Sequence, residues 1–205
     1  MTFGMASFAV MAGPVQHTLG VPVVPEWGIP IGLFLGSVAG LLPDIDEPNA
    51  MLARGSWMPR SLGKPARFLG TIISLPFKIA GYFIKGTLGH RGGTHSFAMS
   101  ILFTVIVAVP VTAFLGVKWD WLIWTVWFGF MSHLFADMLN PSGVPLAWPL
   151  MSKNKTFHVI PSAIRIPTQT PPNIREQFCR MCAYAVMVAC LGIYYVLPLL
   201  WDLTG

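Results

Sequence analysis

Three short polar clusters, each inside an apolar run or next to one, hold the residues best suited to chemistry. Their histidines and aspartates are His90 and His95, His133 and Asp137, and Asp44 and Asp46. The i, i+4 spacing of the second pair places both side chains on one face of a helix. Imidazole nitrogens and carboxylate oxygens together favour zinc, with manganese or iron as alternatives. We therefore predict a divalent metal site where the three clusters meet.

A metal ion with an open coordination position favours hydrolysis, because it acidifies a bound water and polarises an ester oxygen. Asp137 or Asp46 is then the candidate general base, and the planar guanidinium of Arg91 is suited to bind an anionic group of the substrate. Simpler roles stay open. Each histidine could instead donate to a backbone carbonyl, the aspartates could be solvated residues at a helix end, and Arg91 could be a solvated charge.

Hydroxyl groups accompany the predicted metal ligands. Thr94 and Ser96 lie beside His95, and Ser132 precedes His133. Thr94 and Ser96 have two alternative roles: they can bond a ligand imidazole, or they can cap the helix that begins after them. We count all three as candidate supporting residues.

The composition is that of a membrane protein. Of 205 residues, 54% are hydrophobic and only 10% are charged, and the mean hydropathy is +0.64. The net charge of +5 comes from basic residues spread beside apolar runs, so we expect the lipid bilayer as partner and no nucleic acid. The three cysteines indicate no disulfide framework.

The apolar runs predict an all-α, multi-span membrane protein, organised as a single domain over residues 1–205. About four spans are expected, over residues 29–42, 97–117, 121–139 and 181–200, with an interfacial helix over residues 68–88. Residues 3–12 are too short to span, and residues 14–30 contain four prolines, which predict an irregular connection that includes His17. Glycines at 32, 36 and 40 form a small-residue face for close helix packing.

The basic residues also predict orientation. Both Lys- and Arg-rich loops, residues 49–91 and 153–180, should be cytoplasmic, with the turn over residues 118–120 outside. This topology brings the three polar clusters to the cytoplasmic side. We therefore expect the metal site there.

The segments from His90 to Ser96, from Leu42 to Asp46 and from Ser132 to Pro149 together resemble the YdjM-like family of bacterial inner-membrane, metal-dependent hydrolases. The resemblance covers roughly residues 30–180 and implies a multi-span inner-membrane protein whose His and Asp residues bind a metal. It adds His17 as a candidate early ligand and Glu176 as a candidate supporting acid.

The resulting hypothesis is a metal-dependent hydrolase that acts at the cytoplasmic face on a lipid or another ester or phosphoester. Two alternatives are a scaffold with a structural metal and a metal or solute transporter. A closed coordination shell would favour the scaffold. A transporter should continue polar residues through its spans, whereas residues 97–117 offer only Ser100, Thr104 and Thr112.

Overall fold

The computed structural model describes residues 2–20, 23–47, 50–51, 63–88, 93–116, 119–166 and 173–204. These residues form helices joined by loops, and the described part contains no β-strand beyond an isolated bridge between Val144 and Phe157. The predicted all-α fold is therefore confirmed. In chain order the helices are α1 (Thr2–Val10), η1 (Met11–Val15), α2 (Gln16–Leu19), α3 (Gly28–Ala39), η2 (Leu42–Asp46), α5 (Gly63–Leu88), α6 (Phe97–Leu115), α7 (Trp121–Met138), η5 (Ser162–Ile164), α8 (Ile174–Leu191), η6 (Gly192–Val196) and α9 (Leu197–Thr204).

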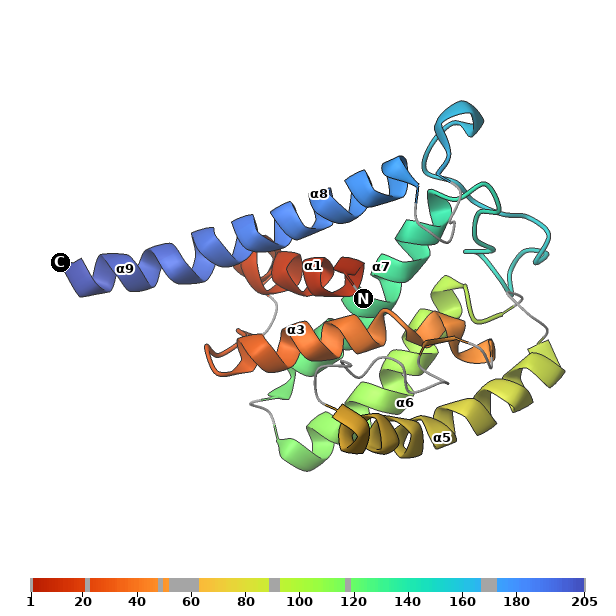
Figure 1. The fold of residues 1–205 in the computed structure, drawn as a ribbon, viewed down its shortest axis with the longest axis horizontal. Coiled ribbons are helices and arrows are strands. Elements are labelled where there is room, and N and C mark those ends of the chain that lie inside the picture. Colours follow the sequence, from red (N-terminus) through yellow and green to blue (C-terminus); the bar gives the residue numbers. More distant parts are fainter. Residues whose placement is uncertain are drawn as a thin grey trace.

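Helix α7 is the centre of the bundle, and α1, α3 and α6 pack against it (Figure 1). Its buried hydrophobic residues belong to two apolar clusters. Phe130 and Leu134 pack with residues of α3 and α6, whereas Trp121 and Leu122 pack with Phe8 and other residues near the N-terminus. Both ends of α7 are thereby held by apolar burial, the main favourable term in a packed core.

The glycine face of α3 allows α1 and α7 to approach closely. A Cβ atom at Gly32 would overlap the ring of Phe8, and one at Gly36 would lie 2.8 Å from the carbonyl oxygen of Gly4. On α7, a Cβ at Gly129 would lie 2.7 Å from the Gly36 oxygen. The predicted small-residue packing face is confirmed, and it brings the end of α3 against the polar half of α7.

Three helices are long and apolar enough to cross a membrane among the described residues: Gly63–Thr87, Phe97–Leu115 and Ile174–Val196. Helix α3 is apolar but shorter. Helix α7, predicted as a span, is not in this set because tryptophans, a histidine and an aspartate lower its hydropathy. The segment predicted as an interfacial helix qualifies by length and composition as a span, so its placement in the interface stays a prediction.

Two predicted boundaries are wrong. Residues 14–19 are helical and not irregular, because Pro14 is accommodated in the wide π turn of η1 and the helix continues to Leu19, ending at Gly20 in the left-handed conformation. The last helix begins at Ile174 and not at residue 181, because the Asn173 side chain accepts a hydrogen bond from the Glu176 backbone N–H, 2.8 Å away, and caps it. From there α8, η6 and α9 run on as one long helix that projects from the bundle (Figure 1).

Candidate metal centre

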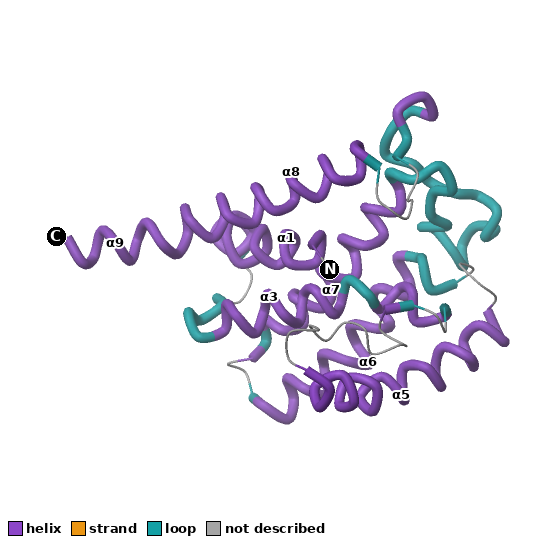
Figure 2. Tube along the Cα trace, in the orientation of Figure 1, coloured by secondary structure: helices purple, strands orange, loops and turns teal. Residues whose placement is uncertain are grey.

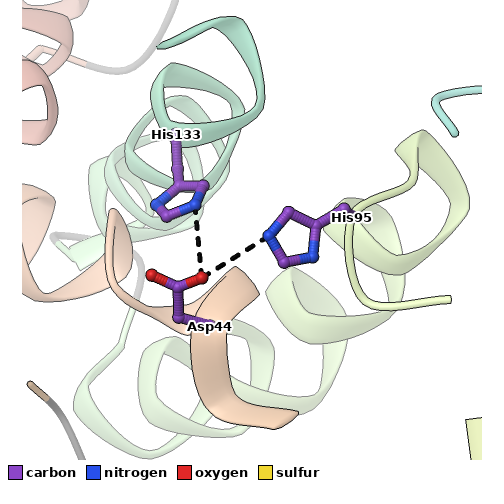
Figure 3. Close-up of side chains that lie close together, drawn as sticks. All are labelled: Asp44, His95 and His133. Atoms are coloured by element: carbon purple, nitrogen blue, oxygen red, sulfur yellow. Dashed lines mark ion pairs between the residues drawn. The ribbon is translucent and has the colours of Figure 1, made fainter. Parts of the chain in front are cut away.

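Three segments far apart in the sequence meet at one end of the bundle. Asp44 lies in η2, His95 lies just before α6, and His133 lies near the end of α7. One ligand atom from each of these residues lies within 4.8 Å of the others, and Figure 3 shows both imidazoles pointing toward the Asp44 carboxylate. Because the three residues come from three separate segments of the chain, only the tertiary structure brings them together.

Asp137 adds a second carboxylate to this group. Its Oδ2 atom lies 3.5 Å from Nε2 of His95 and 3.6 Å from Nε2 of His133. The Oδ1 atom of Asp44 lies 3.5 Å and 3.6 Å from the same two nitrogens. Each imidazole therefore faces one oxygen of each aspartate.

The start of α6 holds His95 in place. The Thr94 hydroxyl lies 3.0 Å from Nδ1 of His95, and Ser96 caps α6 by accepting a hydrogen bond from the Met99 backbone N–H at 3.2 Å. The Phe97 backbone N–H donates to the Leu146 carbonyl at 2.9 Å, which ties this start to the loop after α7. Figure 2 shows that this loop lies at the same end of the molecule. Of the two roles predicted for these hydroxyls, Thr94 has the imidazole contact and Ser96 has the cap.

The end of α3 fixes the ring of His133. Nδ1 of His133 lies 2.7 Å from the Gly40 carbonyl oxygen, and a carbonyl can only accept, so Nδ1 carries the proton. In a neutral ring Nε2 would then be the unprotonated nitrogen, and it faces the Asp44 and Asp137 carboxylates. Metal-bound histidines are commonly held in this way through their other ring nitrogen.

A divalent ion fits these donors. Nε2 of His95 and Nε2 of His133 are both buried, and neither makes a hydrogen bond within the part of the chain that the structure describes. Buried polar atoms are normally satisfied, so two such nitrogens facing two carboxylates are unusual. Neighbouring ligands on a tetrahedral zinc ion, bound at about 2.0–2.2 Å, lie about 3.3–3.6 Å apart. Four of the six separations among these donors, the nitrogen–oxygen ones, are 3.5–3.6 Å and fall in that range.

Access to the group is uneven. The His95 side chain is 2% exposed, whereas the Asp44 side chain is 39% exposed. On the other side, Asp137 lines a cavity of about 330 Å³ together with Asn140, Glu176 and Arg180. The group is thus closed at His95 and open at Asp44 and on the cavity side of Asp137, where a water or a substrate can approach.

Asn140 is a residue of the site that the sequence alone did not identify. Its Nδ2 atom donates to Oδ1 of Asp137 at 3.1 Å, which leaves Oδ2 directed at the imidazoles. The i, i+3 spacing of Asp137 and Asn140 was a usable signal, because residues three apart share a helix face. The contact with the Gly40 carbonyl, in contrast, could not be predicted from the sequence, because every residue has a backbone carbonyl.

The other predicted site residues are placed differently. His17 is exposed and stacks on Tyr194, with ring centroids 5.0 Å apart. Asp46 is fully buried, and Ser132 donates to the Gly129 carbonyl of its own helix at 2.7 Å. Glu176 pairs with Arg180 at 2.6 Å and reaches the cavity beside Asp137, not the imidazoles. The remaining predicted ligand, His90, and the predicted substrate-binding Arg91 lie outside the described residues.

The fold and this group define a helical membrane protein with a partly buried cluster of His and Asp residues whose donor atoms suit a divalent metal. The chain belongs to the YdjM inner membrane protein family, whose family model matches residues 1–200. It is therefore an inner membrane protein, and the membership of the YdjM family that the sequence indicated is confirmed.

Curated relatives cover part of the chain. Proteins named "Inner membrane protein YdjM" from Escherichia coli (strain K12) and Shigella flexneri are each 32% identical to it over 115 residues. That alignment covers 53% of this chain and 44% of each relative, so the chain matches less than half of the length of these relatives. No solved structure matches the chain significantly.

Proposed function

We propose that this protein is a metal-dependent hydrolase of ester or phosphoester bonds, with zinc as the metal and manganese or iron as alternatives. The observation that carries the proposal is the pair of buried Nε2 atoms, on His95 and His133, that face carboxylate oxygens at 3.5–3.6 Å and make no hydrogen bond among the described residues. His95, His133 and Asp44 would hold the ion, with Asp137 as a fourth ligand or as the general base.

The ion, when bound, supplies Lewis acidity toward a carbonyl or phosphoryl oxygen and toward water. Asp137 is suited to take a proton from the attacking water, because Asn140 holds its Oδ1 and its Oδ2 faces the site. Water then adds at the acyl carbon or phosphorus, the bond to the leaving oxygen breaks, and the proton passes to that oxygen to give an acid and an alcohol. We assign the base role to Asp137 and not to Asp46, since the fully buried Asp46 has no access to a substrate.

Two features favour hydrolysis over the alternative roles. The 39% exposure of the Asp44 side chain leaves room for water, unlike the closed shell of a structural metal. Within α6, the hydroxyls of Ser100, Thr104 and Thr112 bond carbonyls of their own helix at 2.7–3.0 Å. These hydroxyls are thus accounted for by helix hydrogen bonding, and no transport path is needed to explain them.

The Asp137→Asn substitution tests the catalytic role. It keeps the shape and one ligand oxygen of the side chain but removes its charge and basicity, so we expect retained fold, some retained metal and turnover lowered by about 100-fold or more. The assay measures hydrolysis of mixed membrane lipids and soluble phosphoesters by wild type and variant with added zinc or manganese. Equal turnover by both would reject Asp137 as the base, and no turnover by either would favour a structural metal.

We further propose that the site faces the cytoplasm, because both basic loops should lie on that side. A reporter fused after Lys155 is expected to report the cytoplasm, and one fused after Lys118 the outside. The reverse pattern would place the site on the periplasmic face and remove the cytoplasmic leaflet as the source of substrate.

A further inference from the structure

A second cavity lies directly beside the cavity of about 330 Å³ at the candidate site, which we call the polar cavity because Asp137, Asn140, Glu176 and Arg180 line it together with apolar residues. The second cavity has a volume of about 700 Å³ and lies between α1, α7 and α8. Its walls are almost entirely apolar and include Val10, Trp127, Phe128, Met131, Phe135 and Val186. We call this the α1/α7/α8 groove. Its volume lies within the range of about 300–1,000 Å³ that is usual for small-molecule sites.

The groove and the polar cavity are neighbours that share walls. Phe3 and Cys179 line both of them. Asp137, whose Oδ2 atom faces the two imidazoles, lines the polar cavity, and so does Arg180, the cationic residue among its described lining residues. A molecule that extends across the shared wall would have its polar part at Asp137 and its apolar part in the groove.

The groove also opens where lipid is expected. Helix α8 belongs to the candidate span Ile174–Val196, almost none of whose apolar stretch is buried, and Val186 on its groove side is 44% exposed. On the α7 wall, Phe135 is 51% exposed. Since the chain is an inner membrane protein, an apolar groove bounded by such a helix is accessible to acyl chains in the bilayer.

We propose that the α1/α7/α8 groove binds an acyl chain of a membrane lipid and that the same lipid places its headgroup ester in the polar cavity beside Asp137. This inference rests on the proposed hydrolase function and specifies its substrate class as an acylated membrane lipid. The two cavities are adjacent; charged side chains line one of them, whereas the walls of the other are almost entirely apolar, which matches an amphiphile better than a small soluble ester. Burial of methylene groups in the groove supplies binding energy remote from the reacting bond.

The test uses a pair of valines on α8. Val186→Trp fills the groove from its half-exposed wall, whereas Val188→Trp adds the same bulk at a position that is 64% exposed and does not line the groove. The full-length protein in detergent micelles is photolabelled with phosphatidylglycerol that carries a diazirine in one acyl chain, and labelled peptides are mapped by mass spectrometry. Labelling is measured without added metal, so it reports binding and not turnover.

We expect wild type and Val188→Trp to be labelled on α1, α7 and α8 near the groove. Labelling there should fall by about tenfold or more in Val186→Trp, because excluding even two methylene groups from apolar burial costs about that factor in affinity. Equal labelling of both variants, or label spread evenly over all lipid-facing helices, would overturn the proposal and identify only surrounding bilayer lipid.

A soluble phosphoester separates this proposal from the hydrolase itself. If Val186→Trp hydrolyses the soluble phosphoester as wild type does but loses turnover of phosphatidylglycerol, both proposals are supported. If the labelling result is as expected but no substrate turns over, the groove binds lipid and the hydrolase proposal fails. If Val186→Trp turns over both substrates as wild type does, the groove proposal fails while the hydrolase proposal stands.

Discussion

Histidines at the two ends of α3 are in opposite environments. Beyond its C-terminal end lies the group of Asp44, His95, His133 and Asp137, in which the imidazoles are buried or nearly buried and face carboxylates. His17 lies in α2, before the N-terminal end of α3, and is exposed and stacked on Tyr194. Twelve helical residues separate the two ends, a length of about 18 Å. Both regions contain histidine, but they differ in the burial of the imidazole and in whether carboxylates face it.

The difference lies in what holds the second ring nitrogen. Nδ1 of His133 is 2.7 Å from a carbonyl of a different helix, and Nδ1 of His95 is 3.0 Å from a buried hydroxyl. Each contact orients its ring and directs Nε2 into the site. Among the contacts seen in the structure, His17 makes only the ring stacking with Tyr194. Stacking fixes the plane of the imidazole ring but does not direct either ring nitrogen toward a particular point. The candidate ligands therefore differ from His17 in that a second contact orients the imidazole ring.

The largest effect is expected when one histidine from each of these two regions is replaced. His133→Ala removes a proposed ligand, so we expect metal affinity to fall by more than about 100-fold, beyond the 10- to 100-fold typical for loss of an outer partner. His17→Ala should leave metal binding unchanged. Elemental analysis of the purified variants after dialysis measures the effect. Equal metal content in both, with the fold intact by circular dichroism, would place His133 among packing residues.

A smaller effect is expected when only the partner of a ligand is removed. Thr94→Val keeps the volume but removes the hydroxyl beside Nδ1 of His95, so metal affinity should fall by about 10- to 100-fold. Thr125→Val is the matched control, because Thr125 is also buried but its hydroxyl bonds the Trp121 carbonyl within α7. Titration with zinc in the presence of a competing chelator compares the two. A loss in both variants alike would indicate a general packing effect.

The smallest effect is expected at Ser96, two residues after Thr94. Ser96→Ala removes the cap of α6, which typically lowers stability by about 1 kcal/mol, while leaving the ring contact of His95 in place. We expect a lower thermal unfolding midpoint with metal affinity within about twofold of wild type, since cap loss acts on the helix end. A drop in metal affinity as large as that of Thr94→Val would show that the cap itself positions His95.

Much of the fold and the outline of the site could be predicted from sequence. Apolar runs indicated the helices, and the glycine spacing on α3 indicated its close packing. The i, i+4 spacing placed His133 and Asp137 on one face, and the distribution of basic residues brought the Asp44, His95 and His133 segments to one end. In the structure those side chains do lie together. These features depend on local periodicity and on charge, which a single chain displays directly.

What the sequence alone determined is therefore the helical membrane architecture and the set of candidate metal ligands. Only the tertiary structure decided which of them meet and how they are aimed. The Gly40 carbonyl that orients His133, the Asn140 amide that turns Asp137, and the division of roles between Thr94 and Ser96 all depend on how α3, α6 and α7 are rotated about their axes. Side-chain spacing fixes positions on one helix. The relative rotation of packed helices comes from contacts such as those of Gly36 with α1 and α7, which pair residues distant in the chain.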